Sequence, residues 1–134
     1  MLSKKAQYAL KAISYLVNKP LSEPISITEI AVAKKIPLKF LEVILLQLKR
    51  EGVLDSKKGK SGGYFFAKSP ANFSVATVIR VIDGPLSLLP CVSLYFYEKC
   101  EHCEEPVCSM NRIFSEARDA TLKVLEKKTL QDLA

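Results

Sequence analysis

The chain of 134 residues has a single histidine, and the 116 residues outside the range 91–108 include no cysteine. It also lacks a serine-elbow motif and a phosphate-binding loop, so little is available for acid–base or nucleophilic catalysis, and an enzyme is not expected. The longest uncharged stretch, residues 84–97, has fourteen residues and two prolines, which is too short and too broken to span a membrane. Apolar residues at the N-terminus are spaced as in an amphipathic helix, not as in a signal peptide. We therefore expect a cytoplasmic protein with no membrane partner, in which structural disulfides are rare.

Positive charge is concentrated in the N-terminal half. Residues 1–70 contain thirteen Lys or Arg against five Asp or Glu, a net +8, whereas residues 71–134 contain seven against nine, a net −2. A basic half joined to a mildly acidic half indicates that one end of the protein meets a polyanion and the other end does something else. A solvated, lysine-rich surface would have the same composition, so charge alone leaves both interpretations open.

Three helix signals follow one another in the basic half. Ser3 can cap a first helix, whose buried face would carry Ala6, Ala9, Ala12, Ile13, Leu16 and Val17. The stretch "ISITEI" (residues 25–30) has the spacing of a capping box and a hydrophobic staple, and Pro37 keeps this second helix short. A third helix is expected over about residues 38–51, ending at Gly52, with an inner stripe of Leu38, Leu41, Leu45 and Leu48. A short helix, a tight turn and a longer helix predict a helix-turn-helix.

The segment "VLDSKKGKSGGYFFAK" (residues 53–68) places two β-prone stretches, 53–56 and 64–67, around a loop of lysines and glycines. Glycines supply turn conformations and keep the loop thin. Its tip is made positive by Lys57, Lys58 and Lys60. A helix-turn-helix followed by a basic hairpin is typical of a winged helix, in which the third helix enters the major groove of double-stranded DNA and the wing reaches phosphates or the minor groove. The predicted fold class is mainly α with a small β-hairpin.

The outward face of the third helix carries side chains suited to DNA. Lying opposite the leucine stripe at helical spacing are Lys39, Glu42, Val43 and Leu46. Lys39 suits a phosphate or a guanine, Glu42 could accept a hydrogen bond from a cytosine amine, and Val43 could contact a thymine methyl. A simply solvated Glu42 is the alternative interpretation.

The C-terminal half is expected to hold a sensor loop and a dimerisation helix. A fourth helix, capped by Ser74, should end at residue 83, and the cysteine segment after it has no sustained periodicity and is predicted to be a loop. A long helix follows over about residues 110–127, and Thr129 can cap a last short turn. Small alanines in its apolar stripe allow close helix–helix approach, so we expect a homodimer, with packing inside one subunit as the alternative. The expected division is a DNA-binding domain (1–84), a cysteine-rich sensor loop (85–109) and a dimerisation helix with a C-terminal turn (110–134).

All four cysteines lie within eighteen residues, in the pattern Cys91-x8-Cys100-x2-Cys103-x4-Cys108. Such a density of thiols suits an iron–sulfur cluster, a structural zinc ion or a metal-free thiol switch, and the spacing alone does not separate them. A thiol oxidoreductase could use the CxxC pair, but the usual strand–CxxC–helix setting is absent. A structural zinc protein that binds other proteins would leave the basic wing incidental. Other polar residues of the segment are His102, which could replace one thiol, and Glu98, Glu101, Glu104 and Glu105, whose negative field would favour an oxidised cluster or simply solvate the loop.

Four stretches together resemble the IscR/NsrR/CymR group of bacterial winged-helix regulators, the Rrf2 family, and the resemblance covers essentially the whole chain. They are "LSKKAQYALKAISYL", "ITEIAVAKKIPLKFLEVILLQLKREGVL", "KKGKSGGY" and "VIRVIDGP". The resemblance implies a homodimeric transcription factor with crossed long helices and two heads on DNA. It implies that Glu42 reads bases, that Lys58 replaces a wing arginine that enters the minor groove, and that Lys39 contacts DNA. Ser61 and Val43 stand where a glycine and a glutamine are usual, so a different preferred DNA sequence is expected.

The resemblance also bears on the thiols. Cluster-binding members of the family have three spaced cysteines, sometimes with a histidine shortly after the last. By that pattern Cys91, Cys103 and Cys108 are implied as ligands of a 2Fe–2S or 4Fe–4S cluster. Cys100 would be the fourth ligand, because Asn111 stands at the histidine position, and zinc is the alternative metal. The loop is then expected to sense an iron–sulfur, redox or nitrosative signal and to set DNA affinity.

Overall fold

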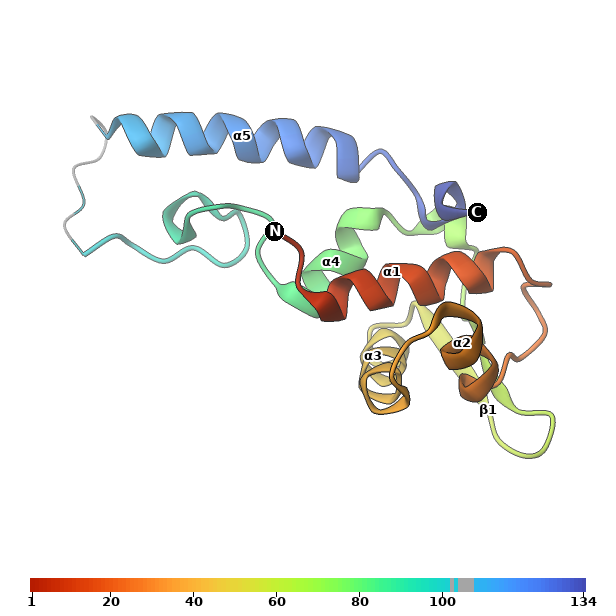
Figure 1. Ribbon diagram of the computed structural model, residues 1–134. Coiled ribbons are helices and arrows are strands. Elements are labelled where there is room, and N and C mark those ends of the chain that lie inside the picture. Colours follow the sequence, from red (N-terminus) through yellow and green to blue (C-terminus); the bar gives the residue numbers. More distant parts are fainter. Residues whose placement is uncertain (102, 104–107) are drawn as a thin grey trace.

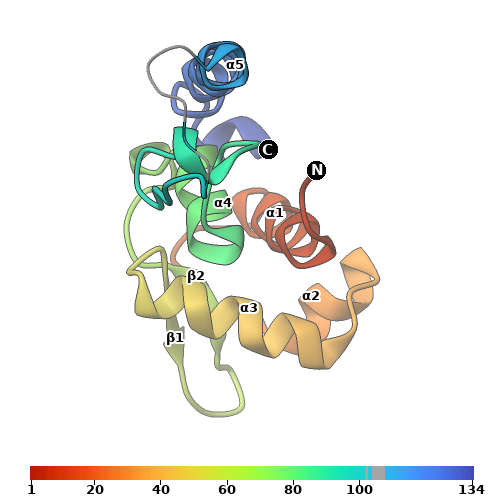
Figure 2. The same ribbon diagram turned by 90° about the vertical axis from the view of Figure 1, so that its left-hand side faces the viewer.

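The structure, a computed structural model, describes residues 1–101, 103 and 108–134. Two parts are visible in Figure 1: the N-terminal helices pack together with a hairpin, and the long helix α5 (Ser109–Leu125) projects from them with the cysteine segment beside it. Figure 2 shows the hairpin loop and α5 at opposite ends of the molecule. Within the described part of the chain, none of the helices combines the length and apolar character needed to cross a bilayer.

Serine side chains begin the first two helices, as predicted. In α1 (Lys4–Val17) the Ala6 amide donates to Ser3 Oγ (3.0 Å), and in α2 (Ile27–Lys34) the Glu29 amide donates to Ser26 Oγ (3.1 Å). The other half of the expected capping box is replaced, because the Glu29 carboxylate accepts a hydrogen bond from the Tyr15 hydroxyl (2.7 Å). That contact joins α2 to α1, so the carboxylate serves tertiary packing instead of its own helix end.

The third helix, α3 (Leu38–Arg50), confirms most of the predicted leucine stripe. Its buried residues are Leu41, Ile44, Leu45 and Leu48. The prediction for Leu38 is wrong, since 43% of that side chain is exposed, and Ile44 takes the fourth buried position. The physical reason is that the core does not reach the start of α3. Residues 38–40 are therefore all exposed, and the buried stripe begins at Leu41. The tight turn before α3 places Lys35 in the left-handed region, with φ at 53°.

The hairpin is the predicted wing, with each strand displaced by one residue from its expected span. Strand β1 (Leu54–Lys57) pairs antiparallel with β2 (Gly63–Phe66). An additional bridge to β2 was not predicted: the Ile25 amide donates to the Tyr64 carbonyl (2.9 Å), and the Tyr64 amide donates to the Ile25 carbonyl (2.8 Å). These two bonds attach the wing to the residues just before α2, so the wing and the helix-turn-helix are held as one unit.

The fourth helix, α4 (Val75–Asp83), is capped by Ser74 and ends at Gly84, as predicted. Its last carboxylate returns to the start of α1, because the Ser3 amide donates to Asp83 Oδ2 (3.0 Å) and the Ser3 hydroxyl donates to Oδ1. An anionic side chain at a helix N-terminus is favoured by the helix dipole. The end of α4, where the cysteine segment begins, is therefore tied to α1.

The C-terminal turn η3 (Leu130–Leu133) packs into the main core. Thr129 and Asp132 form a reciprocal capping box, which confirms Thr129 as its cap. The Val75 amide donates to the Lys128 carbonyl (2.8 Å), and the Leu130 amide donates to the Phe73 carbonyl (2.9 Å). Leu130 is fully buried in the core cluster, where η3 contacts α1 and the short turn η1 (Pro70–Asn72). The far end of α5 is thus anchored to the N-terminal helices.

The helix α5 lies mostly clear of that core. Leu122 is its one buried residue among those described, whereas Met110, Ile113 and Val124 are each more than half exposed. The described residues of the cysteine segment are irregular, as predicted, apart from the short turn η2 (Pro90–Val92). A long helix with exposed apolar side chains is left beside an irregular segment that carries all the thiols.

Candidate DNA-binding face and cysteine pocket

The outward face of α3 lies at the same end of the molecule as the wing (Figure 2). Lys39, Glu42 and Val43 are all exposed there, and 51% of the valine side chain is accessible. The Lys49 ammonium donates to Ser56 Oγ (2.7 Å), which links the end of α3 to strand β1. This link sets the wing at one angle to the helix, as simultaneous contact with a groove and its backbone requires.

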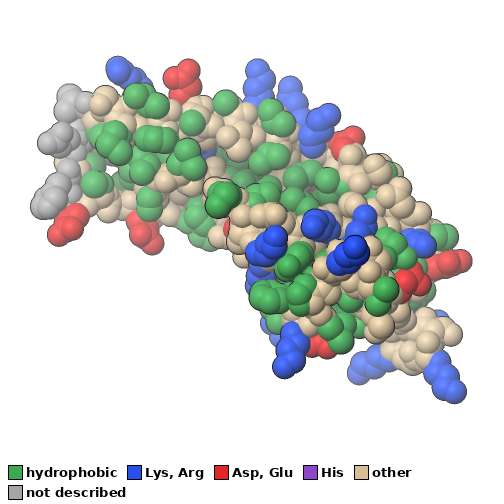
Figure 3. All heavy atoms as spheres, in the orientation of Figure 1, with side chains coloured by type: hydrophobic (Ala, Val, Ile, Leu, Met, Phe, Trp, Pro, Cys, Tyr) green, Lys and Arg blue, Asp and Glu red, His purple; other side chains and the backbone are tan. Residues whose placement is uncertain are grey.

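The wing tip presents positive charge on a thin loop. All four predicted contact residues are exposed: Lys57, Lys58, Lys60 and Ser61. Figure 3 shows lysine and arginine side chains projecting from this end of the molecule. The loop closes tightly, because a Cβ on Gly62 would lie 2.2 Å from the Lys57 carbonyl oxygen. A Cβ on Gly63 would lie 2.1 Å from the Ile25 carbonyl oxygen, so only glycine allows this approach.

The sequence reasoning missed a small basic and aromatic cluster beside α3. The rings of Tyr8 and Phe40 meet edge to face, with centroids 6.0 Å apart. Two ammonium groups lie over the Tyr8 ring, Lys4 at 5.7 Å and Lys11 at 6.0 Å from its centroid. Lys4 and Lys11 lie four and three residues from Tyr8 on one helix, a spacing at which side chains are neighbours. This spacing could have predicted the cluster from the sequence. The cluster extends positive charge from α1 toward α3.

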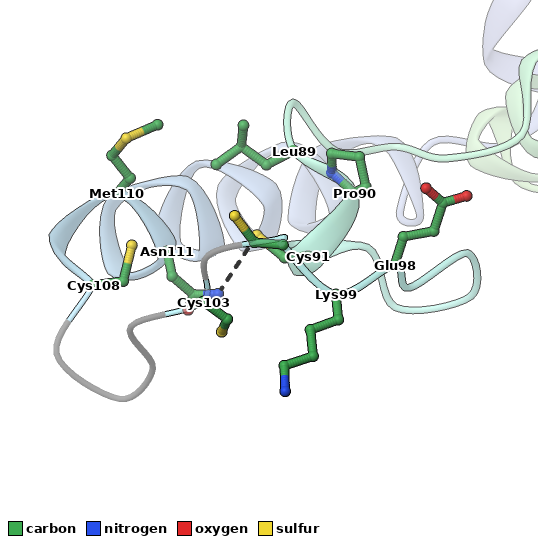
Figure 4. A pocket seen from close by; sticks show the side chains of 10 residues that line it. Leu89, Pro90, Cys91, Glu98, Lys99, Cys103, Cys108, Met110 and Asn111 are labelled. Carbon is green, nitrogen blue, oxygen red and sulfur yellow. Dashed lines mark hydrogen bonds between the residues drawn. The ribbon is translucent and has the colours of Figure 1, made fainter.

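The four cysteines line one cavity of about 260 Å³. It lies between η2, the segment leading to Cys103 and the first turn of α5, as Figure 4 shows. Its other lining residues are Leu89, Pro90, Glu98, Lys99, Met110 and Asn111. The thiols come from different parts of the segment: Cys91 lies in η2, Cys100 and Cys103 follow it, and Cys108 is the N-cap residue of α5.

Local hydrogen bonds hold the cavity's edges. The Asn111 side-chain amide on α5 donates to Cys91 Sγ at 3.9 Å, and this bond is the dashed line in Figure 4. The Glu98 amide donates to the Pro90 carbonyl (3.2 Å), which returns the chain to the start of η2. Asn111 occupies the position at which the family resemblance places a histidine, and its contact with a thiol brings it into the site.

All four thiols are free, and Cys91, Cys103 and Cys108 are half-buried while Cys100 is exposed. Among the described residues, no three His, Cys, Asp or Glu side chains form a group that could hold a metal ion as they stand. The predictions for His102, Glu104 and Glu105 lie outside the described residues. Of the other two glutamates, Glu98 lines the cavity and Glu101 is exposed.

Comparison with known proteins identifies the family. A family model described as "Rrf2: Iron-dependent Transcriptional regulator" matches residues 2–134. The chain belongs to the Rrf2 family. It is 37% identical over 137 residues to a Rhodobacter capsulatus protein named as an rrf2-like HTH-type transcriptional regulator, covering 99% of this chain and 91% of that one. It is 29% identical over 133 residues to the regulator CymR of Bacillus subtilis, covering 99% and 88%.

Solved structures confirm the winged-helix fold of this Rrf2 protein. CymR, described as the global cysteine regulator of Bacillus subtilis, superposes with a TM-score of 0.82 at 29% identity, over 100% of this chain and 95% of that one. IscR of T. potens superposes with a TM-score of 0.79 over 99% and 85%; at 22% identity it supports the fold alone. The relatives are transcriptional regulators, so this Rrf2 protein is a transcriptional regulator and not an enzyme.

Proposed function

We propose that this Rrf2 regulator is a homodimer that binds double-stranded DNA and adjusts its DNA affinity through the cysteine pocket. The observation that carries the proposal is that all four cysteines line one cavity beside α5. Four thiols around one cavity are the donor set of an iron–sulfur cluster. The segment that lines the cavity connects α4 to α5 along the chain, so a change in this segment can alter how the N-terminal helices and α5 sit relative to each other. We place its action in the cytoplasm, with the DNA.

The residues present fit a 2Fe–2S or 4Fe–4S cluster. Cys91, Cys103 and Cys108 are the proposed ligands, and Cys100 is the proposed fourth. A bound cluster would supply a redox-active centre, whose oxidation or loss can report a cellular signal. The Asn111 amide donates to the Cys91 sulfur, and hydrogen bonds to cluster sulfurs and thiolates are among the features that set cluster potentials.

Binding at this pocket requires the segment to move. The thiols line a common cavity, but no three of the described ligand-type side chains are grouped closely enough to hold a metal ion. Coordination would therefore bring the thiols closer together, and part of the binding free energy would be spent on holding them there. A ligand that favours one arrangement of the segment shifts the whole protein toward that arrangement.

DNA recognition is assigned to α3 and the wing. Lys39 and the wing lysines Lys57, Lys58 and Lys60 are proposed to contact phosphates or the minor groove, with Ser61 at the same tip. Glu42 and Val43 project from α3 and are proposed to read base edges in the major groove. The exposure of this face and its link to the wing through Lys49 and Ser56 support the assignment.

The homodimer is assigned to α5. Met110, Ile113 and Val124 are 55%, 56% and 57% exposed, and apolar residues exposed together on one helix mark an interaction site. A second copy of the same helix would cover them, and Ala117 and Ala120 would allow a close approach. Two heads then face DNA together, as operators with two half-sites require.

A metal-free thiol switch is the second candidate, and a zinc-bound form is a further alternative for the same thiols. The observation that favours the switch is the similarity to CymR. A CymR structure from Staphylococcus aureus, described as an oxidised form, superposes with a TM-score of 0.78 at 25% identity. In this version a reaction of the thiols themselves would order or loosen the same segment.

The test begins with anaerobically purified protein. Visible absorption with iron, sulfide and zinc assays identifies what the thiols hold. DNA affinity is then measured on a duplex selected from a random library, for loaded protein, stripped protein and a Cys91/Cys103/Cys108→Ala variant, with Cys100→Ala separating the contribution of the proposed fourth ligand from that of the other three. A sensor predicts affinities that differ by about 5–150-fold between states, a typical allosteric coupling. If all forms bind DNA with the same affinity and sequence preference, the pocket is not a sensor and its role is structural.

A further inference from the structure

We propose that Arg80 is a positioning residue that couples the cysteine pocket to the DNA-binding helices by holding Tyr95 of the cysteine segment. This inference rests on the proposed role of the pocket as a sensor. It names the contact through which a change at the thiols reaches the rest of the protein. Neither Arg80 nor Tyr95 belongs to the thiol set or to the DNA-binding face.

The geometry places Arg80 between three elements. Its guanidinium carbon lies 4.7 Å from the centroid of the Tyr95 ring, within the range of a cation–π contact. The same guanidinium pairs with Glu126, just after α5, with Nη2 and Oε1 2.6 Å apart. Only 22% of the arginine side chain is exposed, so the pair and the stack are partly shielded from water. One side chain of α4 therefore touches both the cysteine segment and the end of α5.

A second arginine holds the other side of the same turn. Arg118 of α5 donates from Nη1 to the Val92 carbonyl (2.6 Å), and its side chain is 16% exposed. The turn between them is closed by the Phe96 amide, which donates to Ser93 Oγ (3.0 Å), and Ser93 is buried. Both guanidinium groups line one narrow crevice with residues 93–96. The turn 92–96 is thus contacted by Arg80 of α4 on one side and by Arg118 of α5 on the other.

This turn is directly connected to the thiols. Cys91 precedes Val92, so the carbonyl held by Arg118 is one residue from a cavity-lining cysteine. If coordination or modification moves Cys91, the Val92 carbonyl must move with it or lose its hydrogen bond from Arg118. The exposed Tyr95 ring, with 68% of its surface accessible, is held on the turn's other side by Arg80. Displacement of the turn at Val92 therefore also displaces Tyr95 and disturbs its stack with Arg80.

Movement of Arg80 is passed to the head because α4 is packed into it. Val78 and Ile79, next to Arg80 in sequence, are buried, and α4 contacts both α1 and α3. Three residues further on, Asp83 holds the start of α1 through Ser3. A tight core transmits a displaced helix as a unit. The orientation of α3 relative to α5, and hence the spacing of two heads in a dimer, then depends on the state of the turn.

The experiment compares DNA affinity in two states of the thiols. Reduced protein and protein fully alkylated with iodoacetamide, checked by mass, are titrated on the library-selected duplex. Alkylation perturbs the pocket whatever its natural ligand is. The variants are Arg80→Gln, Tyr95→Leu and their combination, with Tyr95→Phe as the variant that retains the ring. Arg112→Gln, an exposed arginine at the start of α5, is the charge-matched control.

For the wild type we expect the two affinities to differ by about 5–150-fold. Arg80→Gln and Tyr95→Leu should each reduce that ratio by about 2- to 30-fold, the factor that a cation–π contact contributes. The double variant should lose no more than Arg80→Gln alone, because that substitution already removes the contact that Tyr95→Leu removes, together with the ion pair to Glu126. Tyr95→Phe and Arg112→Gln should keep the wild-type ratio, which a general loss of structure would not allow.

The outcomes separate this inference from the proposed function. A wild-type ratio above one that is unchanged in Arg80→Gln and Tyr95→Leu overturns the role of Arg80 and leaves the sensor intact. A wild-type ratio of one overturns both. If Arg80→Gln does not fold, Tyr95→Leu decides alone, because its side chain lies in an exposed turn.

Discussion

Substituting Gly63 by alanine tests the attachment of the wing to the helix-turn-helix. The backbone of Gly63 has φ at 153°, where L side chains are strained, and an added Cβ would lie 2.1 Å from the Ile25 carbonyl oxygen. The neighbouring bridge holds two hydrogen bonds between Ile25 and Tyr64, at 2.9 and 2.8 Å. The wing can relieve the clash only by separating from Ile25, which breaks both bonds.

The magnitude follows from these two terms. A residue forced into a sparsely populated backbone region costs about 1–3 kcal/mol. Two lost backbone hydrogen bonds cost about 1–3 kcal/mol more, at about 0.5–1.5 kcal/mol each. The free energy of unfolding should therefore fall by about 2–6 kcal/mol, a large share of the about 5–15 kcal/mol that typically stabilises a domain. DNA affinity should fall as well, because the wing lysines lose their fixed position relative to α3.

Urea unfolding and amide hydrogen exchange measure the two consequences. The matched control is Gly59→Ala, at the tip of the same wing: φ there is also positive, at 107°, but a Cβ meets nothing within 4 Å. Gly59→Ala should lose only the stability that backbone strain costs, because its Cβ meets no other atom. The Tyr64 amide should keep its protection from hydrogen exchange in this variant. If Gly63→Ala is no less stable than Gly59→Ala, and the Tyr64 amide stays equally protected, the attachment through Ile25 is not what holds the wing.

Three further predictions use other parts of the molecule. Lys58→Gln should weaken binding to all duplexes and lower the salt slope by about one, whereas Glu42→Ala should mainly relax base preference; equal, sequence-independent losses would count against base reading. Glutamates at Ala117 and Ala120 should raise the dimer dissociation constant by about 100-fold or more, and an unchanged dimer mass in light scattering would show that α5 is not the interface. Lys35→Gly should raise the free energy of unfolding in urea by about 0.5–1 kcal/mol, because φ at that position is 53°; a loss of stability would contradict the left-handed turn.

Local chemistry explains where the sequence predictions succeeded. Ser3, Ser26, Ser74 and Thr129 each mark a helix start, because a short polar side chain can accept from a backbone amide that would otherwise have no partner. Gly52 and Gly84 follow helix ends with positive φ. These signals act within a few residues, so they can be read without knowing the tertiary structure.

Leu38 and Glu29 show where that reading fails. Leu38 has the right spacing for the inner stripe, but the core does not reach the start of α3, and so it stays exposed. Glu29 has the right spacing for a capping box, but the Tyr15 hydroxyl lies close enough to compete for its carboxylate. In both residues the local pattern was compatible with two outcomes, and packing against another helix selected between them.

The sequence by itself determined the family, the order and approximate ends of the helices, the basic wing and the confinement of all thiols to one loop. Only the tertiary structure decided that the four thiols share a cavity, that Ile25 pairs with Tyr64, and that Arg80 meets Tyr95. The physical reason is range. Caps, turns and helical periodicity depend on neighbours within about one or two turns, whereas these contacts join segments whose approach depends on how the whole backbone packs.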